Sequence, residues 1–157
     1  MVQLLIWGPV VLLPLANLLS AFHSGVSFDF SQTALWVLGA VAEELFYRFF
    51  LLKKLLFERT EMKGANAVFL VAVLFAAMHL FNLRAGTGLF PVLAQAVCAF
   101  CFSVWAGAVV WKSGSVALPL LAHVLLNLTA FEGGGMLIPV AAGILVLLAG
   151  LFLLGIK

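Results

Sequence analysis

Two adjacent glutamates and an arginine interrupt an otherwise apolar stretch of the sequence, ALWVLGAVAEELFYRFFLL. Glu44 and Arg48 are four residues apart, so on a helix they share a face and can pair, whereas Glu43 is rotated by about 100° from Glu44. This spacing predicts one paired carboxylate and one free carboxylate. The same residues also fit a helix-packing ion pair beside a protonated second glutamate, and this stretch alone leaves both interpretations open.

Two histidines lie in other apolar stretches of the chain. His79 follows Phe75 by one helical turn in FLVAVLFAAMHLFN, and His123 precedes Asn127 by one turn in ALPLLAHVLLN. Ionisable and polar side chains at membrane depth need polar partners, because lipid offers none. We therefore expect the three stretches to point these groups at one another around a small cavity that admits water.

Such a cluster contains the groups that amide hydrolysis needs. A carboxylate beside an imidazole can deprotonate water, and an imidazole with a carboxamide can donate hydrogen bonds to an oxyanion. Other membrane-protease chemistries lack their residues: HExxH is absent, Asp29 is the sole aspartate, and WKSGS lacks the first glycine of a serine-nucleophile motif. A proton-coupled carrier, which would also place Glu, His and Arg in mid-membrane, remains an alternative.

The composition indicates that the bilayer is the solvent of this chain. Hydrophobic residues make up 66% of the sequence and charged residues 9%, against about 25% charged in a soluble domain. The mean hydropathy is +1.26. A net charge of +2 is too small for a nucleic-acid-binding face, so we expect no such partner.

The apolar runs predict an all-α fold, a polytopic membrane bundle of about six transmembrane helices. Short connections make neighbouring helices antiparallel, and we expect one integral membrane domain over 1–157 with its motif-bearing core at about 33–131. The expected spans are 2–22, 33–52, 66–83, 89–111, 115–131 and 136–156.

The positions of Lys and Arg predict the orientation, because basic residues near membrane ends stay in the cytoplasm. Arg84 is the only basic loop residue on the predicted outer side. We therefore expect a cytoplasmic N-terminus and a multi-pass location in the bacterial inner membrane. The residues expected on the cytoplasmic side are Lys53, Lys54, Arg59, Lys63, Lys112 and Lys157.

The three motifs together resemble a known family. EExxxR at Glu43 to Arg48, FxxxH at Phe75 and His79, and HxxxN at His123 and Asn127 occur in the order of the CPBP (Abi) family. That family includes the type II CAAX prenyl proteases and the bacteriocin-processing or self-immunity proteins. The resemblance covers about residues 33–131 and implies an intramembrane glutamic protease.

The resemblance also implies catalytic roles. Glu43 is expected to be the general base, and His79 is expected to position and activate the hydrolytic water with it. His123 and Asn127 are expected to form the oxyanion hole. The substrate is expected to be a membrane-anchored or membrane-inserted peptide or protein, and a catalytically silent bacteriocin-immunity or peptide-binding protein on the same fold is the alternative.

The supporting residues and the cofactor follow from the same resemblance. Glu44 and Arg48 are expected to hold the motif helix in register. Members of the family were long described as metalloproteases and are now regarded as glutamic proteases without a catalytic metal, so we expect no cofactor. Glu43, His79 and His123 could form a two-histidine, one-carboxylate site, which keeps a divalent metal as an alternative.

Overall fold

The computed structural model describes residues 2–24, 30–60, 62, 64–130 and 137–155. Within that part of the chain every regular element is helical, which confirms the predicted all-α class. Asp29, Lys63 and Lys157 from the sequence argument lie outside the described residues. In chain order the elements are α1 (Val2–Ser24), α2 (Phe30–Glu44), η1 (Leu45–Phe57), α3 (Gly64–His79), η2 (Leu80–Ala85), α4 (Leu89–Ser113), α5 (Ala117–Leu128) and α6 (Leu137–Leu154).

Two of the predicted helices change their helical form along their length. η1 is a π-helix that continues α2, and η2 is a 3₁₀-helix that continues α3. With these continuations counted, the described residues form six helical rods in the predicted order. The second rod extends beyond the predicted 33–52 at both ends. The change to a π-helix falls directly after Glu44, inside the EExxxR motif.

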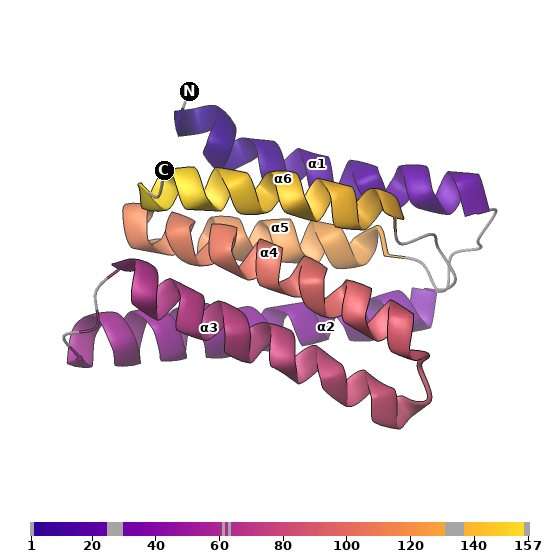
Figure 1. Ribbon diagram of the computed structural model, residues 1–157, viewed down its shortest axis with the longest axis horizontal. Coiled ribbons are helices and arrows are strands. Elements are labelled where there is room, and N and C mark those ends of the chain that lie inside the picture. Colours follow the sequence, from indigo (N-terminus) through magenta and orange to yellow (C-terminus); the bar gives the residue numbers. More distant parts are fainter. Residues whose placement is uncertain (1, 25–29, 61, 63, 131–136, 156–157) are drawn as a thin grey trace.

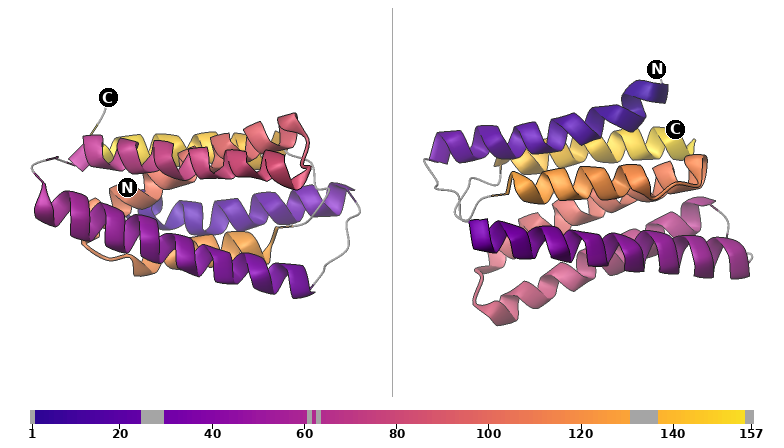
Figure 2. Two further views of the ribbon diagram at one scale, coloured as in Figure 1. Left: turned by 90° about the horizontal axis from the view of Figure 1, so that it is seen from below. Right: turned by 180° about the vertical axis from the view of Figure 1, so that it is seen from behind.

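Consecutive rods run antiparallel, so the two termini lie at one end of the bundle and the turn between η2 and α4 lies at the other (Figures 1 and 2). That turn is sharp because Gly86 adopts a left-handed conformation with φ of 85°, which ends η2. α2 packs against α5, α1 against α5 and α6, and α4 against α3 and α6. Three of the four motif-bearing elements, η1, α3 and α5, contact α4.

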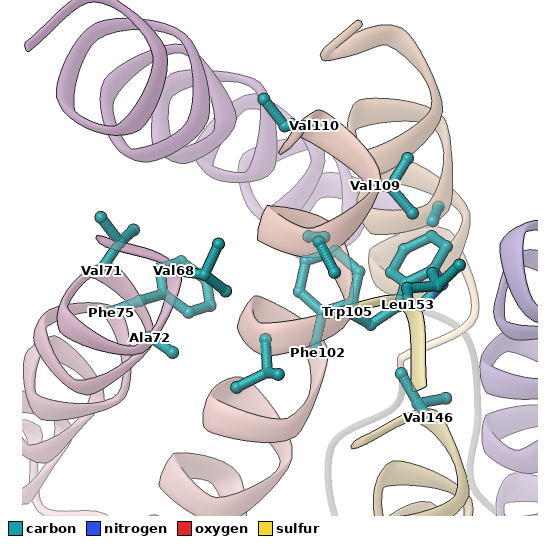
Figure 3. Packing of buried hydrophobic residues seen from close by; sticks show 14 of the residues in the cluster. Val68, Val71, Ala72, Phe75, Phe102, Trp105, Val109, Val110, Val146 and Leu153 are labelled. Carbon is teal, nitrogen blue, oxygen red and sulfur yellow. The ribbon is translucent and has the colours of Figure 1, made fainter. Parts of the chain in front are cut away.

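The centre of the bundle is α4. Its residues 101–110 are all buried, and Trp105 is completely buried, as expected for a helix that is apolar on every side. Figure 3 shows Phe102 and Trp105 of α4 between Phe75 of α3 and Val146 of α6. The same apolar core that holds the bundle together therefore reaches the motif residue Phe75.

A proline in α1 frees a backbone carbonyl that α4 uses. Pro9 has no N–H, so the carbonyl of Leu5, four residues earlier, loses its helical donor. The indole nitrogen of Trp105 donates to that oxygen at 2.9 Å. α1 is bent near this end (Figure 1), as helices usually are at proline. The bond ties α1 to the central helix.

Several glycines allow other helices to lie very close to α4, among them Gly107 and Gly150. A Cβ atom added at Gly150 of α6 would lie 2.8 Å from the backbone N and Cα of Trp105. One added at Gly107 of α4 would lie 2.8 Å from a methyl carbon of Val68. Small residues at helix contacts are the usual means of tight packing inside membranes, where burial of apolar surface gives no driving force between helices.

The outer surface of the bundle is apolar. Large hydrophobic side chains are exposed on all six rods, among them Leu4, Phe22, Leu38, Phe90 and Leu137. Among the described residues, four stretches are long and apolar enough to cross a bilayer, namely Val2–His23, Gly64–Ala85, Leu89–Ser113 and Leu137–Leu154. A surface of this kind is stable in lipid and not in water. The chain is an integral membrane protein.

Candidate active site

The second rod places an ion pair inside the bundle. Nη1 of Arg48 lies 3.1 Å from Oε1 of Glu44, and the two side chains are 0% and 1% exposed. The predicted pairing of these two residues is thus confirmed. The contact is close enough for an ion pair but is not aligned as a hydrogen bond.

Two phenylalanines enclose the arginine. The guanidinium carbon of Arg48 lies 4.3 Å from the centre of the Phe75 ring and 5.3 Å from that of Phe102. Ring faces attract a cation at these distances, and the attraction is stronger away from water. Phe75, the first residue of FxxxH, therefore supports the arginine of EExxxR from a different helix.

The buried pair keeps unused hydrogen-bonding capacity. Among the described residues, Nε and Nη2 of Arg48, Oε2 of Glu44 and Oγ of Ser103 have no hydrogen-bond partner. Buried polar atoms in this condition are costly and are rarely retained by packing alone. The cluster is therefore an expensive feature of the fold, which favours a functional role for it.

His123 connects the two glutamates. Its Nδ1 lies 2.9 Å from Oε1 of Glu44, and its Nε2 lies 3.7 Å from Oε2 of Glu43. Because a carboxylate can only accept, we assign the proton on Nδ1, which donates to Glu44. The opposite edge of the ring then faces Glu43. α5 thus presents one imidazole to both carboxylates of α2.

The two adjacent carboxylates have different surroundings. The side chain of Glu43 is 40% exposed, whereas that of Glu44 is 1% exposed. The contact of Glu43 with His123 is longer than a hydrogen bond. Glu43 is therefore the more accessible of the two carboxylates.

His79 ends α3 and is half-buried. Its Nδ1 lies 2.9 Å from the carbonyl oxygen of Phe75, one turn earlier. A carbonyl only accepts, so Nδ1 carries the proton, and Nε2 of the neutral ring is left with a lone pair. Within the described part of the chain neither nitrogen of His79 pairs with a carboxylate. The Phe75 ring links it to the cluster, 4.9 Å from the His79 ring and 5.9 Å from that of His123.

Asn127 ties α5 to α2. Its Nδ2 donates to the carbonyl oxygen of Trp36 at 2.7 Å, which occupies one of the two N–H groups of the carboxamide. α5 has only 12 residues, a rise of about 18 Å, so it ends before it could cross a hydrocarbon core of about 30 Å. Asn127 lies in the last turn of this short helix, one turn after His123.

Contacts from outside the motifs satisfy the carbonyls that α5 leaves free at its end. The backbone N–H and the hydroxyl of Thr129 both donate to the carbonyls of Leu125 and Leu126. Nδ2 of Asn17, from α1, also donates to the carbonyl of Leu126, at 3.1 Å. A helix that ends at membrane depth needs such donors, because lipid supplies none.

Several of these contacts involve residues outside the three motifs and could not be predicted from them. Phe102 beside Arg48, and Asn17 at the end of α5, belong to no motif, and the pair formed by Asn82 and Gln95 lies outside the cluster. Asn82 donates through Nδ2 to Oε1 of Gln95 at 2.7 Å. A signal was present for this pair, since Asn82 and Gln95 are uncharged polar residues in apolar helices.

The described residues contain no group of three or more His, Cys, Asp or Glu side chains placed to hold a metal ion.

These features define a polytopic membrane protein with an ionisable cluster buried at the centre of its bundle. A family model for the type II CAAX prenyl endopeptidases (Rce1-like) matches residues 26–129. The match covers more than half of the 157 residues and contains all three motifs, so the chain belongs to this family of CAAX-protease-type membrane endopeptidases. No curated protein and no solved structure matches the chain.

Proposed function

We propose that this chain is an intramembrane protease of the glutamic type that cleaves membrane-anchored or membrane-inserted peptides. The contrast between the two neighbouring carboxylates carries the proposal. Glu44 is buried and held by Arg48 and His123, whereas Glu43 is 40% exposed and 3.7 Å from the same imidazole. A general base must reach water, and the group that orients it must be fixed.

In the proposed reaction Glu43 accepts a proton from a water molecule while the water oxygen attacks the carbonyl carbon of the substrate. His79 holds the same water through the lone pair on Nε2. The C–N bond then breaks, and Glu43 passes the proton to the leaving amine. One water and one amide are thus converted into one carboxylic acid and one amine, with no further reactant.

The oxyanion of the tetrahedral intermediate is proposed to be stabilised from α5. A protonated His123 donates from Nε2, and Asn127 donates through the N–H that Trp36 leaves free. Glu44 supports the cation, because its contact with Nδ1 balances the charge and fixes the ring plane. Arg48 in turn holds the Glu44 carboxylate in place through its contact at 3.1 Å.

Glu43→Gln tests the assigned base. We expect cleavage to fall by about 10²–10⁴-fold, the usual contribution of general-base catalysis, with little change in thermal unfolding in detergent. The matched control is Glu58→Gln, which removes an exposed carboxylate at the end of the same rod and should leave cleavage unchanged. A Glu43→Gln variant that cleaves at the wild-type rate would refute the assignment.

Two quenched fluorescent peptides serve as probes in proteoliposomes. One carries an S-farnesyl cysteine followed by three apolar residues, and the other is the same peptide without the prenyl group. Cleavage of the first alone would assign the prenylated class of substrate. Binding of either peptide without cleavage would favour the immunity or peptide-binding alternative.

The metal-free mechanism is part of the proposal and has its own test. Cleavage is expected to persist after exhaustive dialysis against a chelator. Loss of cleavage that added Zn²⁺ restores would favour the two-histidine, one-carboxylate alternative for Glu43, His79 and His123 instead.

We also propose a cytoplasmic N-terminus in the bacterial inner membrane. Lys53 of η1 donates to the carbonyl of Gly114 at 2.6 Å, which brings it to the same end of the bundle as Lys112. Basic residues gathered at one end mark the cytoplasmic side. Single cysteines at Ser115 and Thr87 should label with an impermeant maleimide from the cytoplasmic side and from the opposite side, respectively; the reverse result would refute the orientation.

A further inference from the structure

A pair of carboxamides joins η2, which begins directly after His79, to α4 and belongs to none of the three motifs. Asn82 of η2 donates through Nδ2 to Oε1 of Gln95 of α4 at 2.7 Å, and both side chains are half-buried. η2 and α4 are the two sides of the turn at the end of the bundle opposite the termini (Figure 1). Two polar side chains at this position need a reason, because apolar residues would pack there at lower cost.

The bond between the two side chains leaves one acceptor and one donor group without a partner among the described residues. Oδ1 of Asn82 can still accept a hydrogen bond, and Nε2 of Gln95 can still donate. An acceptor and a donor together can pair with one residue of an extended peptide, whose N–H and C=O point to the same side of the strand. A peptide that unwinds in order to be hydrolysed at membrane depth exposes such groups without water to satisfy them.

The 3₁₀ form of η2 places this pair at a defined distance from the candidate site. His79 immediately precedes η2, and side chains three residues apart on a 3₁₀-helix lie above one another. Asn82 is therefore one turn beyond His79, a rise of about 6 Å. An extended peptide advances about 3.3 Å per residue, so this distance corresponds to about two residues of substrate.

We propose that Asn82 and Gln95 form a binding site for the main chain of the peptide substrate, about two residues from the scissile bond. Oδ1 of Asn82 accepts from a substrate N–H, and Nε2 of Gln95 donates to a substrate C=O. The site recognises an extended backbone rather than particular side chains. It rests on the proposed function, because it takes the substrate proposed for Glu43 and His79.

The test measures binding separately from cleavage, with both probe peptides and the uncleaving variant Glu43→Gln in detergent. Each peptide is made with one amide at a time replaced by an ester, which removes a single N–H, over three bonds on either side of the scissile bond. We expect one ester, about two residues away, to raise the Kd by about tenfold, the effect of losing one hydrogen bond.

Three variants separate binding from a purely structural role of the pair. Asn82→Leu should bind the amide and that ester with equal Kd, because the acceptor is gone. Gln95→Glu keeps an acceptor for Nδ2 of Asn82 and loses the donor, so it should weaken binding of every peptide about tenfold while the ester effect persists. The control is Asn66→Leu, which replaces an exposed asparagine of α3. Its Kd values should equal those of Glu43→Gln alone.

The outcomes distinguish this inference from the proposed catalysis. An ester effect that persists in Asn82→Leu, or unchanged binding in Gln95→Glu, would overturn the backbone site and leave the pair as a link between η2 and α4. If the Kd values follow the expected pattern but the wild-type protein cleaves neither peptide, the backbone site is supported and the proposed catalytic function is refuted. Failure of Asn82→Leu to fold does not prevent the test, since Gln95→Glu retains the link.

Discussion

The contact between α4 and α6 and the contact between α2 and α5 hold the same bundle together by different means. Along α4 and α6 the backbones approach because Gly150 leaves no side chain in front of Trp105. Along α2 and α5 the helices are joined by polar bonds, from His123 to Glu44 and from Asn127 to the carbonyl of Trp36.

The difference follows from the solvent. Lipid is as apolar as leucine, so two helices in a bilayer associate through close packing or through hydrogen bonds. A close-packed contact does not tolerate an added atom, whereas a hydrogen-bonded contact loses little when one bond is removed. Substitutions in the α4–α6 contact should therefore reduce stability, and substitutions in the α2–α5 contact should reduce cleavage more than stability.

Arg48→Met is expected to have the largest effect on stability, because Arg48 of η1 pairs with the buried Glu44 at the α2–α5 contact. Removing one member of a buried ion pair leaves the other charge without compensation, which destabilises by about 3–5 kcal/mol. Within the described residues, Glu44 would keep only its contact with His123. Thermal and denaturant unfolding in detergent measures the loss.

The double variant Glu44→Gln, Arg48→Met is the matched control. It removes both charges while the glutamine oxygen still accepts from His123, so most of the lost stability should return. Cleavage should not return, because the charge that supports a protonated His123 is gone. A double variant less stable than Arg48→Met would show that the pair contributes more than mutual compensation of charge.

The spacing of apolar and charged residues was sufficient to predict the helices and the pair of Glu44 and Arg48. Six apolar runs correspond to six rods in the part of the chain that the structure describes, because in a bilayer length and hydropathy nearly determine a helix. The pair could be predicted because both members lie on one helix, four residues apart. The family was also predictable, since its three motifs are local patterns.

The contacts between helices could not be predicted in the same way. That Phe102 would lie over Arg48, or that one imidazole would touch both glutamates, depends on how three rods approach one another. The π-helix after Glu44 had no signal in the sequence. The catalytic roles of Glu43, His79, His123 and Asn127 remain predictions, and His79 is joined to the cluster through the ring of Phe75 rather than directly.

Gly150→Ala tests the close-packed contact and should have the second largest effect on stability. The added Cβ would lie 2.8 Å from the backbone of Trp105, which cannot turn aside as a side chain can. Overpacking of this kind costs about 1–3 kcal/mol, measured by unfolding in detergent. Gly39→Ala in α2 is the control: nothing lies within 4 Å of its added Cβ, so stability should be equal or up to about 1 kcal/mol higher.

The smallest expected changes in stability are those at two asparagines that each donate one hydrogen bond to a backbone carbonyl. Asn17→Leu removes the bond from α1 to Leu126, and Asn127→Leu removes the bond from α5 to Trp36. Hydrogen bonds between membrane helices contribute about 0.6–1.7 kcal/mol, so both variants should lose a similar, small amount of stability.

Their effects on cleavage should differ, because Asn127 is proposed to donate to the oxyanion and Asn17 only holds the end of α5. Loss of an oxyanion donor lowers kcat by about 10²–10³-fold, which we expect for Asn127→Leu alone. Asn17→Leu should cleave within a few-fold of wild type. Equal loss of cleavage in both variants would mean that the placement of α5, and not a hydrogen bond from Asn127, limits the reaction. The distinction between a packed scaffold and a hydrogen-bonded site would then no longer hold at this helix.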